Sequence, residues 1–434
     1  MLHERSEGKD GMLKQIDKRE ALKHAAFIVC VGAASALTSI ILYSCIVLTF
    51  HLYQKYTWLL FLLPLFGIVS LAVYRSFNLP YDYSTEDMVG QMRKNESVSP
   101  TLAPGILIGT CLSILGGATV GKESGALQMG ASVSETIGRR FRLKNCLKSK
   151  QDGILNGYAA QLGMSATFSA LFCAPLCAVF MSLELTHFKN FSIPRFAALI
   201  ASSTLAAVIA KATGIYNIIP KVHIPDFSAS LALNILLVGI VCGVLGCFHG
   251  RAMGVVRRWR QRHIRNPYIA VAIAGVVIVA LISFLKLYAY SGSGAILLSD
   301  ALAGKAGTFD FAIKAGFMLL ALPFGFKGGE ILPTLAIGGL LGCSLGQILG
   351  VEPAFTAAIG IVTFYVGFSR CPLAGFFLGT EVFGWAIAPF MAIGVIVALL
   401  GAEDVGFYGD GVTKLFRKKR EELSCRIAQR SHCS

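Results

Sequence analysis

The sequence is poor in charge. Charged residues make up 15% of its 434 residues, whereas hydrophobic residues make up 55%. Soluble domains carry about a quarter charged residues, so this composition excludes an ordinary soluble domain and favours a chain surrounded by lipid. The 46 glycines fit the same environment, because small residues let membrane helices approach closely.

The usual signatures of catalysis and metal binding are also missing. The 12 cysteines form no Cys-x-x-Cys pair, and the sequence has no His-Glu-x-x-His, Gly-x-Ser-x-Gly or phosphate-loop pattern. We therefore expect no enzyme, metal, cofactor or direct drive by ATP. A cleavable signal is not expected either, because the first apolar run is long and has no small-residue cleavage site.

Positive charge is concentrated in four runs between apolar stretches, although the net charge of +15 alone could suggest nucleic acid. Basic runs on one side of a membrane are the pattern of cytoplasmic loops. We therefore expect a multi-pass protein of the cell membrane with both termini in the cytoplasm, in contact with lipid and not with nucleic acid. The runs lie in 9–23, 139–150, 257–265 and 417–430.

Apolar stretches of two kinds follow one another along the chain. Some are long enough to span a bilayer, and others are shorter or broken by Gly and Pro. Broken segments survive in a membrane only where protein or a water-filled cavity covers them, and paired ones indicate a transport site at mid-membrane. The long stretches are 25–50, 57–75, 102–120, 191–214, 230–256 and 267–290; the broken ones are 121–138, 154–185, 308–349 and 353–401.

An internal repeat relates two halves of the chain. The segment that begins Gly121-Lys122-Glu123 matches the one that begins Gly329-Glu330-Ile331, with Gly, Leu and Gly at the same offsets. Farther on, Ala174-Pro175-Leu176 precedes Glu184 as Cys371-Pro372-Leu373 precedes Glu381, with the same spacing. The loop after the first copy is basic and the loop after the second has no Lys or Arg, which predicts inverted repeats.

These patterns predict an all-α polytopic membrane protein made of two inverted repeats with broken and re-entrant helices. We expect cytoplasmic tails at 1–24 and at 412–434, the latter basic. Between them we expect one transport domain at 25–411, with repeat halves at about 25–215 and 230–405.

Glu123 is the most informative residue. It follows a glycine-rich approach and opens a helix, where bare N–H groups and the helix dipole make an anion site. A carboxylate there can occupy the anion's position and leave when it is protonated. An ionisable group inside a membrane indicates function, although a capping Glu at an exposed helix start is the alternative.

Several ordered motifs resemble the CLC family of chloride channels and transporters, over about residues 70 to 410. Gly121-Lys122-Glu123-Ser124-Gly125 resembles its Gly-(Lys/Arg)-Glu-Gly-Pro motif, with Ser-Gly replacing Gly-Pro. Phe172 to Leu176 and 328–333 are similar to its Phe-Asn-Ala-Pro-Leu and Gly-Gly-x-Phe-x-Pro segments, and 291–294 resembles the Gly-rich turn before the latter.

The resemblance implies a homodimer with one anion pathway per subunit, formed partly by the faces bearing Glu184 and Glu381. It also implies a gating role for Glu123 and a Ser and a Tyr at the central anion site. Ser84 is the candidate Ser, or a plain loop hydroxyl; Tyr408 is the candidate Tyr, or an interfacial anchor. The expected anion-binding positions are Gly121, Lys122, Ser124, Gly125, Gly329, Ile331, Leu332, Ser84 and Tyr408.

Some departures favour the fluoride-exporting branch of the family. The second Glu of many CLC transporters, an internal proton station, is Leu185 here. The segments 325–330 and 381–384 are similar to motifs of the fluoride branch, but Leu332 stands where that branch has Thr. The resemblance implies a proton-coupled halide antiporter for chloride or fluoride, and a passive chloride channel remains the alternative.

Glu330 adds a second carboxylate at the start of the second broken helix, aligned with Lys122 in the repeat. A lone charge there would be costly, so it should pair or become protonated. We expect it to handle protons in place of the missing station. The alternative is a Glu330–Lys327 salt bridge that only fixes the turn.

Overall fold

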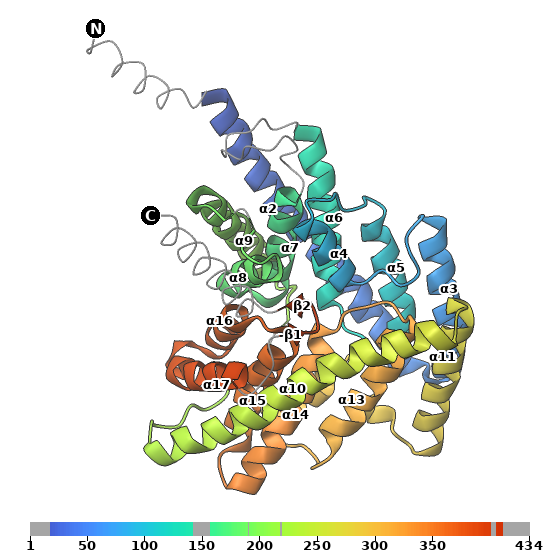
Figure 1. Ribbon diagram of the computed structural model, residues 1–434, viewed down its shortest axis with the longest axis vertical. Coiled ribbons are helices and arrows are strands. Elements are labelled where there is room, and N and C mark those ends of the chain that lie inside the picture. Colours follow the sequence, from blue (N-terminus) through green and yellow to red (C-terminus); the bar gives the residue numbers. More distant parts are fainter. Residues whose placement is uncertain (1–17, 142–156, 190, 218, 401–404, 411–434) are drawn as a thin grey trace, which may run out of the picture.

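The computed structural model describes residues 18–141, 157–189, 191–217, 219–400 and 405–410. Nearly all of these residues are helical, as the sequence predicts (Figure 1). The predicted tails lie largely outside the described residues. The helices are α2 Lys18–Lys55, α3 Leu63–Ser76, α4 Thr85–Arg93, α5 Leu102–Leu115, α6 Glu123–Phe141, α7 Tyr158–Phe172, α8 Pro175–Leu185, α9 Ile193–Thr213, α10 Ala229–His263, α11 Pro267–Phe284, α12 Ala295–Leu302, α13 Asp310–Ala321, α14 Ile331–Leu349, α15 Pro353–Ser369, α16 Pro372–Phe383 and α17 Ala388–Leu400.

Short 3₁₀ turns and one small hairpin complete the described chain. The turns are Thr57–Leu62, Tyr288–Tyr290, Leu322–Phe324 and Trp385–Ile387. The hairpin pairs β1 (Val405–Gly406) with β2 (Gly409–Asp410) in antiparallel register, and it carries Tyr408 in its turn.

Six helical segments of the described chain are long and apolar enough to cross a membrane. Five match predicted spans: α2, the segment Thr57–Ser76 that contains α3, α9, α10 and α11. The sixth is α14, within the predicted broken stretch 308–349. The predicted span 102–120 ends earlier, at Leu115, because the chain turns at Gly117 with a positive φ of 79°.

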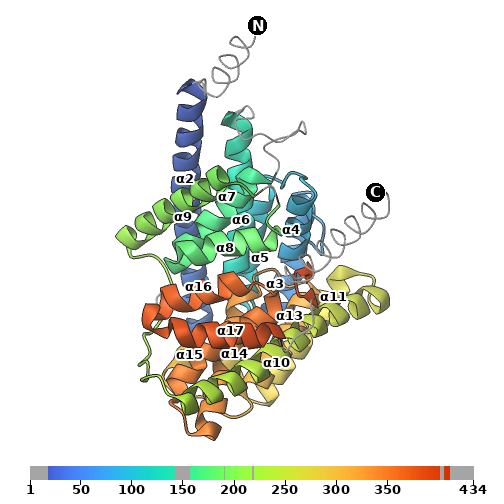
Figure 2. The same ribbon diagram turned by 60° about the vertical axis from the view of Figure 1, so that its left-hand side comes forward.

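The two halves repeat one packing arrangement. In the first half α7 contacts α2, α6, α8 and α9; in the second half α15 contacts α10, α14, α16 and α17. Figure 2 shows the blue and green half above the orange and red half, with α8 and α16 side by side at the boundary. Phe180 of α8 and Phe377 of α16, which are equivalent in the repeat, stack with ring centroids 4.7 Å apart.

Glycines allow equivalent helix pairs to cross in close contact. A Cβ atom on Gly163 of α7 would lie 2.1 Å from the carbonyl oxygen of Gly130 of α6. In the second half, a Cβ atom on Gly360 of α15 would lie 2.4 Å from the carbonyl oxygen of Gly338 of α14. Neither crossing could admit a side chain without moving backbone, so the crossings fix the helices that begin at Glu123 and Ile331.

Each repeat also places a carboxylate on a helix of the other. Glu184 of α8 accepts hydrogen bonds from the N–H groups of Leu373 and Ala374, at 2.9 and 2.8 Å. Glu381 of α16 accepts from the N–H groups of Leu176 and Cys177, at 3.0 and 2.8 Å. These reciprocal caps satisfy the exposed N–H groups at the starts of α8 and α16 and join the halves.

Small residues near the starts of α8 and α16 lie against neighbours within the chain. Ala174, Ala178 and Ala374 are fully buried. Cβ atoms on Gly375 and Gly379 would meet side chains of Val366 and Met391. These five positions therefore serve packing within the subunit.

We predict that Gly163→Ala destabilises the protein by about 2 kcal/mol or more, because its methyl group would overlap backbone atoms. Gly316→Ala is the matched control, since a Cβ on Gly316 of α13 would meet nothing within 4 Å. Thermal unfolding in detergent should show a lower transition temperature for Gly163→Ala only. Equal transition temperatures for the two variants would contradict this role of the crossing.

Candidate functional site

The two broken helices start at a single point where the halves meet. Gly121 and Gly329, equivalent in the repeat, form an antiparallel bridge in which each N–H donates to the other's carbonyl oxygen, at 2.6 Å in both directions. A Cβ atom on Gly329 would lie 2.7 Å from the amide nitrogen of Ser124. The bridge therefore requires glycine and holds the N-termini of α6 and α14 together.

Glu123 is the first residue of α6 and is completely buried. One carboxylate oxygen accepts from the N–H of Lys122 at 2.9 Å, and the other lies 3.4 Å from the side-chain nitrogen of Asn217. This excludes the alternative of an exposed capping Glu. The carboxylate occupies the kind of position, at a buried helix start, that an anion would take.

A cavity of about 320 Å³ lies beside Glu123 and is here called the Lys122 cavity. Its wall includes Lys122, Asn217 and Leu332, together with His51 and Ser293. The Lys122 ammonium group lies 4.3 Å from the centre of the Tyr43 ring in a cation–π arrangement.

Glu330 lies on the opposite side of the bridge, and its side chain is buried. Its N–H donates to the Ser124 hydroxyl at 3.2 Å, and its carboxylate accepts from the Tyr408 hydroxyl at 2.5 Å. The structure thus brings together Glu330, Ser124 and Tyr408, three of the predicted site residues. The hydroxyl of Tyr408 is buried within the protein, which excludes an interfacial anchor.

The Glu330–Lys327 salt bridge, which was the alternative to a proton role for Glu330, is not formed between these two described residues. The Lys327 ammonium group donates to the carbonyl oxygen of Tyr81 and lies 4.0 Å from the centre of the Tyr74 ring. The turn at 325–328 directs Lys327 toward α3, away from the carboxylate, because Gly325 and Gly328 both have positive φ angles. Glu330 therefore has hydroxyl partners instead of a cation.

A second cavity, of about 450 Å³, lies beside Glu330 and is here called the arginine-lined cavity. Ser84 on its wall is the N-cap of α4 and forms a capping box with Asp87. Its hydroxyl donates to Asp87 at 2.7 Å and accepts from Arg257 at 3.3 Å, so its single proton is already used. The arginines of the wall are Arg251, Arg257, Arg258 and Arg260.

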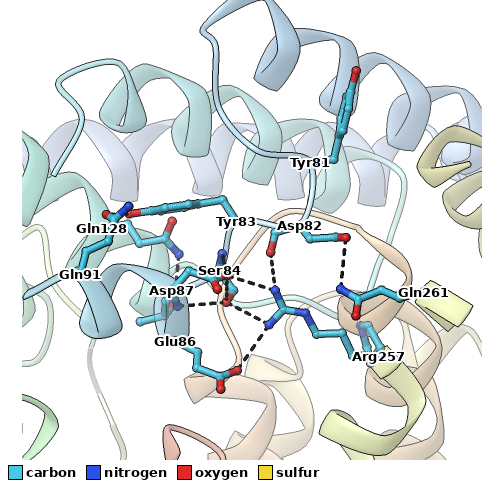
Figure 3. Close-up of polar contacts among 12 residues, drawn as sticks. Tyr81, Asp82, Tyr83, Ser84, Glu86, Asp87, Gln91, Gln128, Arg257 and Gln261 are labelled. Carbon is cyan, nitrogen blue, oxygen red and sulfur yellow. Dashed lines mark hydrogen bonds and ion pairs between the residues drawn. The ribbon is translucent and has the colours of Figure 1, made fainter. Parts of the chain in front are cut away.

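Arg257 of α10 ties the turn before α4 to the second half. Figure 3 shows its guanidinium group between Asp82 on one side and Glu86 and Asp87 on the other. It donates to the Asp82 carbonyl oxygen at 2.6 Å and pairs with the Asp87 carboxylate at 3.0 Å.

Two carboxylates on this wall differ in the direction in which their surroundings shift the pKa. Burial raises the pKa of Glu86, and the charge of Arg257 only partly offsets it. Burial also acts to raise the pKa of Asp82, but the hydrogen bond and charge of Arg260 hold that pKa below its ordinary value. Glu86 is therefore the more easily protonated of these two carboxylates.

Three polar residues at the site were not predicted from the sequence. Asn217 lies in the connection between the halves, where no motif marks it. Thr85 and Gln128 are buried and joined by a 3.0 Å hydrogen bond on the wall of the arginine-lined cavity. Gln128 follows Glu123 on the same helix, and this was the only feature of the sequence that could have placed it at the site.

The remaining predicted anion-binding positions surround the bridge. Ile331 and Leu332 are buried at the start of α14, and Leu332 contributes to the wall of the Lys122 cavity. A Cβ atom on Gly125 would be 3.6 Å from Ile106 and Thr110, so this glycine borders α5.

Comparison with known proteins identifies the family. The model of a family described as voltage gated chloride channel matches residues 66–403. The chain belongs to this family, the CLC proteins. A chloride/fluoride channel protein of Pseudomonas syringae pv. tomato is 27% identical over 366 residues, covering 82% of this chain and 78% of the relative.

Solved structures confirm the CLC fold. A CLC-type fluoride/proton antiporter superposes with a TM-score of 0.82 at 24% identity, covering 91% of this chain and 98% of the other. A slow cyanobacterial Cl⁻/H⁺ antiporter gives 0.78 at 18% identity, covering 92% and 98%. The chain is thus a multi-pass CLC membrane protein of the class that transports anions.

We predict that Arg257→Met destabilises this CLC protein by about 1–2 kcal/mol, because charged hydrogen bonds to the 82–87 turn are lost. Arg258→Met removes the same charge from the neighbouring, exposed position and is the control, with an expected effect within about 0.5 kcal/mol. Chemical unfolding in detergent measures both. Similar losses in the two variants would show that charge alone, and not these bonds, matters.

Proposed function

We propose that this CLC protein exchanges a halide, chloride or fluoride, for protons, and that Glu123 is the gate. The observation that carries the proposal is the buried Glu123 carboxylate at a helix N-terminus, next to Lys122 and Asn217 of the Lys122 cavity. An anion and this carboxylate compete for the same N–H groups. Protonation of Glu123 weakens its hold and lets the anion enter.

Glu330 supplies the second proton position in this proposal. The position of the usual internal station is Leu185, which is apolar and buried. Glu330 is buried, faces hydroxyl groups instead of a cation, and lies on the wall of the arginine-lined cavity. A carboxylate in that setting can be held in either protonation state, because hydroxyls both donate and accept.

The arginine-lined cavity is assigned to the cytoplasmic side in this proposal, because basic residues favour that side. The proposal also places both termini in the cytoplasm of a protein of the cell membrane. The transport domain is taken as 25–411 between basic tails, and the active unit as a homodimer. Exposed apolar side chains on the outer faces of α16 and α17, such as Leu373 and Ile396, support a second copy or lipid there.

A passive chloride channel is the second candidate, because a protonatable gate serves both functions. The bonded Glu330–Tyr408 pair favours antiport, since a channel needs no second proton position. The names of the relatives include both chloride and fluoride. Electrode measurements of chloride and fluoride efflux from proteoliposomes, with pH recorded, distinguish these candidates.

We predict that Glu123→Gln removes proton-coupled movement by about tenfold or more while anion flux persists, because glutamine mimics the protonated gate and carries no proton. Proton and anion fluxes from the same proteoliposomes give the ratio. Glu352→Gln, which alters an exposed carboxylate paired with His223, is the control and should match wild type. Wild-type coupling in Glu123→Gln would refute the gate.

Glu330→Gln should leave anion flux measurable and reduce the proton-to-anion ratio by about fivefold. The expected loss follows from its role as the second proton position, whereas a purely structural carboxylate would leave the ratio unchanged. Tyr408→Phe removes the hydroxyl that binds Glu330 and should change the ratio in the same direction. An unchanged ratio across pH in Glu330→Gln would reject the proton role.

A further inference from the structure

Thr85 and Gln128 form a polar pair that the mechanism above does not use. Thr85 is the first residue of α4 and Gln128 lies five residues after Glu123 on α6. Both side chains are about 1% exposed, and the Gln128 amide nitrogen donates to the Thr85 hydroxyl at 3.0 Å. Both residues share the wall of the arginine-lined cavity with Glu330.

The direction of these hydrogen bonds follows from counting protons. A threonine hydroxyl has one proton, and the Thr85 oxygen already accepts from Gln128. Its own proton is therefore directed elsewhere, and the Glu330 carboxylate, on the same cavity wall, is the acceptor that we assign to it. The pair thus presents an O–H donor to Glu330, alongside the donor from Tyr408.

The other end of the Gln128 amide has no partner. Its carbonyl oxygen is buried and makes no hydrogen bond with any part of the chain that the structure describes. An unpaired buried acceptor costs about 1–3 kcal/mol. Rotation of the amide by half a turn would bring this oxygen to the Thr85 hydroxyl and remove the cost, provided that Glu330 no longer needs the Thr85 proton.

We propose that Gln128 and Thr85 form a reversible pair that offers N–H groups to the transported anion only when Glu330 is protonated. This proposal rests on the proposed function and names the residues that couple anion to proton. With Glu330 ionised, the bonds run from the Gln128 amide to Thr85 and on to the carboxylate.

Protonation of Glu330 reverses the direction of these hydrogen bonds. The carboxyl proton is then donated to the Thr85 oxygen, and the Thr85 proton is donated to the Gln128 carbonyl oxygen. The Gln128 N–H₂ group moves to the place of that oxygen, where its protons are available to an anion. The only covalent bonds that change are O–H bonds, because Glu330 gains a proton from a hydronium ion in the cavity, which becomes a water molecule.

Other charged and titratable groups around Glu330 must be separated from this effect. Glu123 lies two residues from Gly121 of the Gly121–Gly329 bridge, Tyr408 donates to Glu330 itself, and Lys327 lies nearby with the Tyr81 carbonyl oxygen as its partner. The cavity wall adds Tyr81, Asp82, Tyr83, Glu86, Asp87, Arg251, Arg257, Arg258, Arg260 and Gln261 as charged or polar groups. Measurements in a Glu123→Gln background remove the titration of the gate, and a Glu330→Gln variant identifies what depends on Glu330.

The test is calorimetric binding of sodium fluoride and sodium chloride to the full-length protein at about pH 5 and about pH 8. In the Glu123→Gln background, the anion should bind more tightly at the lower pH. Adding Gln128→Met should lower the affinity by about fivefold at low pH and change it little at high pH. Thr85→Val should do the same, and Thr85→Ser should restore the background behaviour because it keeps the hydroxyl.

Adding Glu330→Gln should give an affinity that no longer changes with pH. The proposal is overturned if Gln128→Met leaves the pH dependence intact, or lowers the affinity equally at both pH values. It is also overturned if Thr85→Ser behaves as Thr85→Val does. Flux measurements on wild type decide proton coupling separately, so a passive channel with pH-dependent binding would refute the proposed antiport and still support the Gln128–Thr85 pair.

Discussion

The structure depends on one short contact, the two hydrogen bonds between Gly121 and Gly329. They lie where the halves meet, so the same residue of each repeat pairs with its counterpart. Because neither position has a side chain, two helix N-termini come close enough to share a small region. Glu123 and Glu330 lie in this region because each is within two residues of one of the bridging glycines.

Buried charge around this contact is neutralised without ion pairs between full charges. The carboxylates of Glu123, Glu184 and Glu381 accept from backbone N–H groups, and Glu330 accepts from a hydroxyl. Lys122 and Lys327 lie over aromatic rings. Both lysines line cavities, and no described carboxylate lies within ion-pair distance of either. A basic side chain with no carboxylate partner among the described residues therefore borders each cavity.

Much of this arrangement could be predicted from the sequence because the repeat supplies two copies of each constraint. Glycine and proline at matched offsets located both broken helices, and the position of Glu123 at a helix start followed from its glycine-rich approach. The partner of Glu330 could not be predicted in this way. Sequence proximity favoured Lys327, but positive φ angles at Gly325 and Gly328 turn the lysine away, and the real partner, Tyr408, lies 78 residues along the chain.

The hydrogen-bond partners of Ser84 and Asn217 could not be predicted from local sequence patterns either. The hydroxyl of Ser84 is used by the capping box and by Arg257, whose distant position no spacing rule gives. Asn217 reaches Glu123 from the connection between the halves, which carries no periodic signal.

The reciprocal caps of Glu184 and Glu381 show that helix starts other than that of α6 also bind a carboxylate. Four helix starts gather near the middle of the molecule, and each can hold a negative charge. At α8 and α16 the occupant is tethered to the opposite repeat and cannot leave without separating the halves. At α6 the occupant is the first residue of the helix itself, so the movement proposed for Glu123 would break no contact between the halves. The residue that supplies the carboxylate therefore decides whether such a site joins the two halves permanently or can be vacated.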